Sequence, residues 1–109
     1  MILDGGGMAA EGDPHFVNDA EGERYELWLG DARAGSIQYQ TQPGVIVLIH
    51  TEIGPEFEGR GLATRLVADA LQDIRARGLK ARPGCSFVRD YLRNHPEQWD
   101  LVLPRAASR

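Results

Sequence analysis

VIVLIHTEI, residues 45–53, runs directly into GPEFEGRGLA, residues 54–63. The first segment opens with a continuous apolar, β-branched run, which predicts a central strand of a sheet that is buried on both faces. A Gly-Pro pair ends this strand, and Gly59 and Gly61 then precede a long amphipathic segment. A helix that begins in this way has free backbone N–H groups in its first turn, and these groups and the helix dipole attract anions. We therefore expect a phosphate or diphosphate site at this junction.

Phosphate-binding loops that contain two such glycines differ in the residues around them. A Walker loop requires Gly-Lys followed by Ser or Thr, and the chain contains no such triplet. A dinucleotide-binding loop requires a third glycine where this chain has Thr64, and its fold needs more βα units than 109 residues can hold. Both classes are therefore excluded. A turn without any ligand remains compatible with a lone Gly-x-Gly.

The Gly-x-Gly with small residues after it resembles the acyl-CoA loop of the GNAT acetyltransferase superfamily. That family has Gln/Arg-x-x-Gly-x-Gly/Ala, and Glu56, Gly59 and Gly61 stand at the matching positions, with glutamate in place of the usual residue. Further blocks stand in the family's order: HTE at 50–52, PGCSFV at 83–88 and YLRNHP at 91–96. These blocks look like those of the very small GNAT-like proteins. The resemblance covers roughly residues 16–102.

Periodicity along the chain predicts an α+β fold with a three-layer tendency. Alternating residues predict strands at 16–18, 25–29 and 36–40, which with residues 45–53 form an antiparallel meander of about four strands. Apolar residues at three- and four-residue intervals predict a helix from residue 62 to about 77, capped by Gly78. A fifth strand at 79–82 completes a strand–helix–strand crossover. Short helices are expected at 86–94 and 97–103, with Trp99 and Val102 packing inward.

The resemblance implies a minimal GNAT fold in which residues 15–103 form one acetyl-CoA-binding domain. Residues 1–14 and 104–109 are expected to be disordered tails. Typical members of the family carry one or two helices between their first two strands, whereas this chain has only a short turn there. We therefore expect an open and shallow acceptor groove.

The cofactor-binding candidates follow from position and from the resemblance. The backbone N–H groups at the start of the helix are expected to reach the diphosphate of acetyl-CoA; they belong to Glu58, Gly59, Arg60, Gly61, Leu62 and Ala63. Arg60 and Arg65 are candidates for the outer phosphates. The resemblance implies that the pantetheine arm pairs with the end of the preceding strand, at Thr51 and Ile53.

The catalytic candidates are His50, Glu52 and Cys85. His50 and Glu52 lie two apart on a strand and therefore face the same side, and a histidine can take a proton from an ammonium near neutral pH. A surface histidine beside a surface glutamate is the structural alternative. Cys85 precedes a predicted helix, where the dipole favours a thiolate. The resemblance implies that Cys85 lies near the thiol of CoA, where it accepts the acetyl group or only lines the thioester pocket. The structural alternative is that Cys85 is a small buried apolar residue.

The expected function is transfer of an acetyl group from acetyl-CoA to a primary amine of unknown identity. A non-catalytic acyl-CoA-binding or sensing module is the alternative, and a small interaction domain without a ligand is a third possibility. Composition is that of one domain with a net charge of −4, which argues against nucleic acid and acidic membranes as partners.

Two further features of the sequence indicate where in the cell the protein is expected and whether it binds a metal. The N-terminal residues lack a signal-peptide pattern, and no apolar run is long enough for a membrane span. A single cysteine fits a reducing, cytoplasmic compartment, and the lack of a Cys/His cluster predicts no metal. We expect a monomer or a weak dimer.

Overall fold

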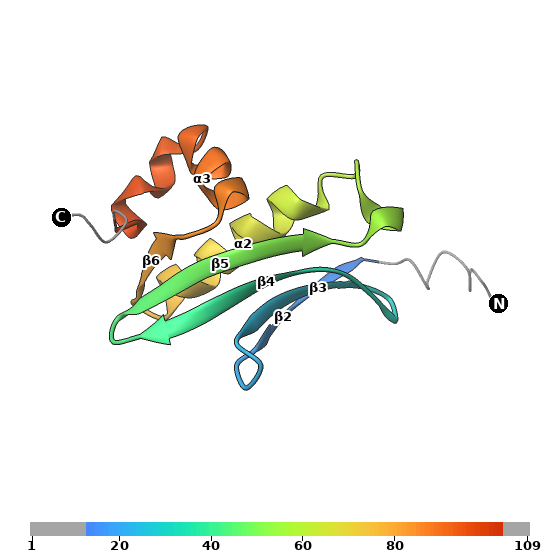
Figure 1. Cartoon of the computed structure of the whole chain (residues 1–109), viewed down its shortest axis with the longest axis horizontal. Coiled ribbons are helices and arrows are strands. Elements are labelled where there is room, and N and C mark those ends of the chain that lie inside the picture. Colours follow the sequence, from blue (N-terminus) through green and yellow to red (C-terminus); the bar gives the residue numbers. More distant parts are fainter. Residues whose placement is uncertain (1–12, 104–109) are drawn as a thin grey trace.

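The computed structural model describes residues 13–103 and forms a five-stranded sheet in the order β2-β3-β4-β5-β6 (Figure 1). The strands are β2 (Pro14–Asp19), β3 (Arg24–Leu29), β4 (Ala32–Gln42), β5 (Val45–Ile53) and β6 (Lys80–Pro83). Neighbouring strands from β2 to β5 are antiparallel, and β6 is parallel to β5. The predicted meander and the α+β class are confirmed. Most of the predicted tails lies outside the described residues, and β2 already begins at Pro14.

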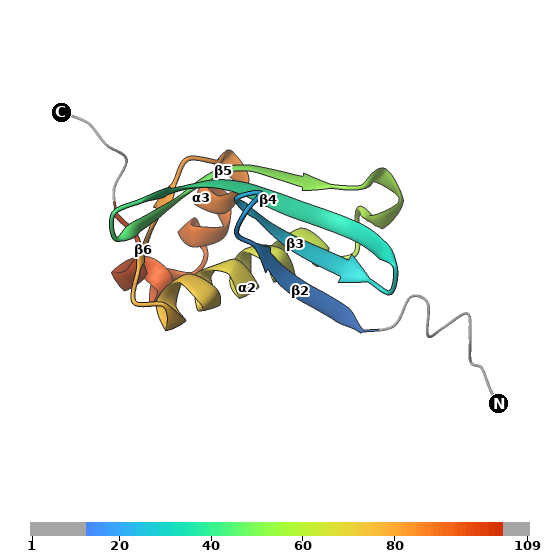
Figure 2. The same ribbon diagram turned by 90° about the horizontal axis from the view of Figure 1, so that it is seen from below.

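The helices pack on one face of this sheet. Helix α2 (Leu62–Ala76) connects β5 to β6, and α3 (Ser86–Arg93) follows β6. Short 3-10 helices, η1 (Pro55–Phe57) and η2 (Pro96–Leu101), precede α2 and follow α3. Figure 2 shows α2 running along the underside of the sheet. The predicted crossover and the short C-terminal helices are confirmed.

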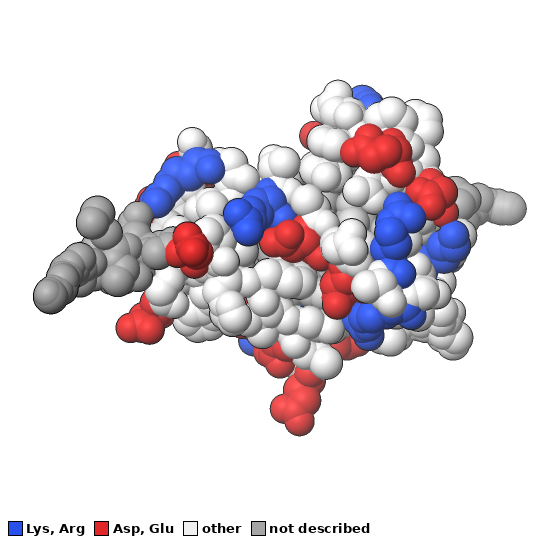
Figure 3. Space-filling model, turned by 180° about the vertical axis from the view of Figure 1, so that it is seen from behind, with Lys and Arg blue, Asp and Glu red and all other residues white. Residues whose placement is uncertain are grey.

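The core lies between the sheet and α2. The helix contributes a fully buried apolar stripe at three- and four-residue intervals: Leu66, Val67, Ala70, Leu71 and Ile74. The hydroxyl of Tyr25 on β3 donates a hydrogen bond of 2.9 Å to Asp73 on α2, and burial together with this carboxylate raises the pKa of Tyr25. Acidic and basic side chains are mixed over the molecule's back (Figure 3). On α2, Nη1 of Arg77 and Oδ2 of Asp73 form an ion pair at 3.1 Å.

Strand β5 is buried on one face only, so the prediction of a strand buried on both faces was wrong. Ile46 and Leu48 are fully buried, whereas Ile49 is 41% exposed. The middle strand of the sheet is β4, and β5 has only the four-residue β6 beyond it. The apolar run was misleading because the second face of β5 carries apolar residues, Val45 and Val47, that are only partly covered.

Trp99 also differs from the prediction that it packs inward. It is 57% exposed, and its indole N–H donates a hydrogen bond of 2.7 Å to the carbonyl oxygen of Leu92. Leu101 is the buried residue of η2, and Val102 packs partly buried against the core. The indole therefore binds the C-terminal end of α3 by its polar edge and leaves the core to a smaller side chain.

Candidate functional site

The site begins where β5 loses one of its two neighbours. Pairing with β6 ends at Leu48 and Pro83, and the N–H of Gly84 then donates to the carbonyl oxygen of Leu48 at 2.8 Å. A Cβ on Gly84 would lie 2.9 Å from that oxygen, so this close approach requires glycine. Beyond this point β5 is paired with β4 alone among the strands of residues 13–103, and no described strand borders its other backbone edge.

A bulge at the same place changes which side chains of β5 face the helices. His50 pairs with Gln38 and Leu48 pairs with Tyr39, so Ile49 is an extra residue without an opposite partner. Before the bulge the even-numbered residues face the core. After it the odd-numbered residues do, since Thr51 lies opposite the buried Ile37.

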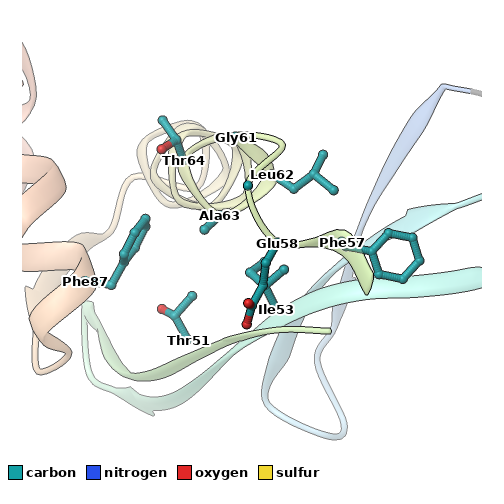
Figure 4. Close-up of a pocket in the computed structure, with 10 residues that line it drawn as sticks. Thr51, Ile53, Phe57, Glu58, Gly61, Leu62, Ala63, Thr64 and Phe87 are labelled. Atoms are coloured by element: carbon teal, nitrogen blue, oxygen red, sulfur yellow. The ribbon is translucent and has the colours of Figure 1, made fainter. Parts of the chain in front are cut away.

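A cavity of about 370 Å³ lies beside this open edge, between β5, the loop that carries η1, and helices α2 and α3 (Figure 4). It is lined by Thr51, Ile53, Phe57, Glu58, Gly59, Gly61, Leu62, Ala63, Thr64 and Phe87. We call it the inner cavity. Figure 4 shows Thr51, Ala63, Glu58 and Phe87 around the open space.

All the predicted cofactor-binding residues except Arg60 line this inner cavity. The guanidinium of Arg60 instead lies 5.7 Å from the centre of the Phe57 ring. The second candidate for the outer phosphates, Arg65, pairs with Asp69 on α2 at 3.6 Å. Sequence reasoning missed Phe57, Thr64 and Phe87, because their place depends on how the loop and α3 pack. The position of Phe87 just after Cys85 was the available signal.

The loop before α2 that carries Gly59 and Gly61, here called the glycine loop, has an unusual and open backbone. Gly59 and Gly61 have φ angles of +79° and +74°, which L side chains rarely adopt, and a Cβ on either would meet no atom within 4 Å. The space in front of both residues is therefore open. No side chain caps α2, and the helix's hydrogen bonds start with the N–H of Arg65, so the N–H groups of Leu62, Ala63 and Thr64 are available. The N–H of Glu58, by contrast, donates to the carbonyl oxygen of Pro55 at 3.4 Å.

Cys85 lies behind the cavity wall rather than in it. It is buried, it is the N-cap residue of α3, and its Sγ lies 3.3 Å from Oγ1 of Thr51, which lines the cavity. Burial by itself raises the pKa of the thiol. Hydrogen bonds from the Thr51 side chain and from backbone N–H groups, including that of Val88, outweigh burial and lower the pKa. The predicted preference of this position for a thiolate agrees with these contacts.

His50 and Glu52 lie together on the opposite side of β5. Nε2 of His50 is 3.4 Å from Oε2 of Glu52, and both side chains are mostly exposed. They border a second, open hollow of about 540 Å³ lined by His50, Thr51, Glu52, Ile53, Gly54, Pro55 and Glu58. We call it the outer hollow. Thr51, Ile53 and Glu58 line both spaces, so the end of β5 is the boundary between them.

A buried carboxylate that sequence reasoning did not single out lies on the same outer face. Glu26 is 7% exposed and accepts hydrogen bonds from Trp28, Arg24 and Arg33 at 3.0–3.1 Å. Burial by itself raises the pKa of this carboxyl, but the three donors outweigh burial and hold the pKa below its ordinary value. The alternation of residues 24–29 was the available signal, because it places Glu26 and Trp28 on one side of β3.

The fold agrees with comparisons to known proteins. Residues 24–102 match the family of GCN5-related N-acetyl-transferases, and the chain belongs to this family. None of the curated proteins is similar enough to the sequence to count as a match. Within residues 13–103, no helix is long and apolar enough to cross a membrane, and no three His, Cys, Asp or Glu side chains gather as metal ligands would.

Solved structures show the same fold. A GCN5-like protein from Staphylococcus aureus shares 20% identity at a TM-score of 0.64, over 83% of this chain and 88% of that one. The ribosomal-protein-S18-alanine N-acetyltransferase from Escherichia coli shares 15% identity at a TM-score of 0.50, over 67% of this chain and 43% of that one. At these identities the similarity shows the fold alone.

Proposed function

We propose that this protein binds acetyl-CoA in the inner cavity and transfers the acetyl group to a primary amine that enters from the outer hollow. The observation that carries the proposal is the place of the two spaces, on opposite sides of the open end of β5 and with three lining residues in common. Membership of the acetyltransferase family supports the same reaction. The single free thiol supports a cytoplasmic setting.

The residues of the inner cavity fit such a ligand. Gly59 and Gly61 leave room for a diphosphate against the backbone, and the free N–H groups at the start of α2 supply donors for it. The open edge of β5 at Ile53 offers backbone groups to the pantetheine arm, beside Thr51, whose backbone N–H contacts the thiol of Cys85. Ala63 and Phe87 add apolar surface beside it.

The groups on the outer side of β5 fit the role of proton acceptor. When bound, acetyl-CoA supplies a thioester carbonyl that a neutral amine can attack, forming an N–C bond as the C–S bond breaks and CoA leaves. An amine arrives as an ammonium and must first lose a proton, which His50 takes up while Glu52, 3.4 Å away, stabilises the imidazolium that forms. Thr51 and Cys85 lie on the inner side of the strand, where the thiol is shielded. We therefore propose direct attack by the amine rather than an acetyl-cysteine.

A non-catalytic acyl-CoA-binding module is the second candidate function. The observation that favours it is the exposure of His50 and Glu52, which no described helix covers. CoA release from acetyl-CoA in the presence of polyamines, lysine peptides and aminoglycosides separates the two functions. The enzyme predicts release above hydrolysis with at least one amine and loss of that release in His50→Ala. Binding of acetyl-CoA without release for any amine would support the module.

The role of Cys85 is tested separately by substitution and mass. Direct attack predicts that Cys85→Ala keeps most of its turnover and that intact-mass spectrometry shows no acetyl adduct on the wild-type protein. An adduct on Cys85 together with inactive Cys85→Ala would establish covalent catalysis instead.

A further inference from the structure

The outer sheet face carries a row of three polar residues across its middle strands. Glu26 on β3 pairs with Ser36 on β4, and Ser36 pairs with Glu52 on β5. Ile37, the neighbour of Ser36, is fully buried in the core, so Ser36 points to the opposite, outer face. Its hydroxyl therefore lies between two carboxylate side chains, one strand spacing of about 4.8 Å from each strand.

Ser36 is a buried residue, and the hydrogen-bonding capacity of its hydroxyl is unused among the described residues. The residue is 8% exposed, and within residues 13–103 its hydroxyl has no hydrogen-bond partner. Glu26 beside it, by contrast, accepts three hydrogen bonds. Buried polar groups without partners are rare in folded proteins, and a bound ligand is one of the causes. A ligand that donates a hydrogen bond to Ser36 would satisfy it.

The charges around Ser36 favour a cation. The two arginines on this face, Arg24 and Arg33, are held by Glu26, and Arg24 is also held by Asp19. Glu52 is 72% exposed at its side chain and contacts only His50 among the described ion pairs. Glu58 adds a second carboxylate at the outer hollow. The side of the row that meets the outer hollow is therefore net negative.

We propose that the acceptor is a linear aliphatic diamine, with one ammonium bound between Ser36 and Glu52 on the outer sheet face and the other amine at the open end of β5. An ammonium has three N–H donors and suits a hydroxyl and a carboxylate placed side by side. The inference rests on the proposed function, because it names the substrate class of that reaction.

Binding without turnover is the direct test. Titration of 1,5-diaminopentane into the full-length ¹⁵N-labelled protein should shift the backbone amide signals of Ser36 and Glu52 in a saturable way. Hexylamine, which matches the diamine in length but carries one charge, and 5-aminopentanoate, which carries a carboxylate, should bind about tenfold more weakly, as expected for a lost charge-assisted hydrogen bond. Glu52→Gln and Ser36→Ala should each weaken diamine binding about fivefold. Glu21→Gln, in an exposed turn, should leave it unchanged.

Equal binding of the three amines, or preference for 5-aminopentanoate, would overturn the inference, and the latter would indicate that Arg24 and Arg33 bind a carboxylate. CoA release is measured in parallel. Diamine binding without CoA release under any condition would refute the proposed reaction while leaving the diamine site established.

Discussion

The two faces of the sheet differ in composition and in burial. The inner face packs Leu48, Ile37 and Tyr25 against α2, and all three are fully buried. The outer face carries Gln38, His50 and Glu52 without a covering helix among the described residues. The buried apolar core therefore lies on the inner face, whereas the outer face at β5 leaves polar side chains exposed.

The two faces meet at the open end of β5, and the bulge at Ile49 determines which residue faces which side. Leu48 faces the core, Thr51 faces the inner cavity, and His50 and Glu52 face out. One short segment thus contributes to both the inner cavity and the outer hollow. In the proposed reaction, this one segment would contact both acetyl-CoA and the amine.

Substitutions of two neighbouring residues on β5 should show the largest difference in the free energy of unfolding. Leu48→Ala removes a fully buried side chain and should lower the free energy of unfolding by about 3 kcal/mol, because it leaves a cavity in the core. Ile49→Ala, at a residue 41% exposed, should cost less than about 1 kcal/mol. Urea unfolding of both variants measures the difference. Equal losses would mean that the bulge does not separate the two faces.

Substitutions of two glutamates on the outer face should differ in their cost to the free energy of unfolding, by less than the two substitutions on β5. Glu26→Ala removes the acceptor of Arg33, of the Trp28 indole N–H and of Nε of Arg24, and should cost about 2 kcal/mol. Glu52→Ala, at an exposed residue, should cost close to nothing. Because the pKa of Glu26 is lowered in the folded state, its contribution is present above its ordinary pKa of 4.5 and is lost as the pH falls through the lowered value. Unfolding measured at pH 7 and below pH 4 should therefore show a smaller Glu26→Ala penalty in acid. A penalty independent of pH would contradict the role of the ionised carboxylate.

The smallest effect is expected on the pKa of the Cys85 thiol, which lies behind the inner cavity. Thr51→Val removes the hydroxyl 3.3 Å from Cys85 and should raise the pKa of the thiol toward its ordinary value. The pH dependence of iodoacetamide alkylation should therefore move to higher pH. Thr41→Val, at an exposed position on β4, is the matched control and should not change it. An unchanged profile in Thr51→Val would show that backbone N–H groups alone hold the thiolate.

The features that the sequence predicted are those encoded locally. The glycines before α2, the buried stripe of α2 and the position of Cys85 at the start of α3 each depend on residues near in the chain. Most of the predicted lining of the inner cavity followed from them.

The features that were missed depend on contacts between distant segments. The single buried face of β5 depends on which strands flank it and on what covers the sheet, and Phe87 reaches the cavity only because α3 packs beside β5. The position of Arg60 beside the two glycines is compatible with a phosphate or an aromatic ring as its neighbour, and in the structure its guanidinium lies over the ring of Phe57. A sequence pattern cannot distinguish these alternatives because both satisfy the same local spacing.

Isothermal titration with acetyl-CoA tests most directly whether the glycine loop and the open end of β5 form its binding site. The wild-type protein should bind with a Kd in the micromolar range. Gly61→Trp should abolish binding, because its side chain would fill the open space before the loop. Gly44→Trp is the matched control, since Gly44 has a φ of +72°, equally open surroundings and a position in the β4–β5 turn. Gly44→Trp should still bind acetyl-CoA. The proposed binding site would be contradicted if the wild-type protein did not bind acetyl-CoA, or if Gly61→Trp bound it as tightly as Gly44→Trp.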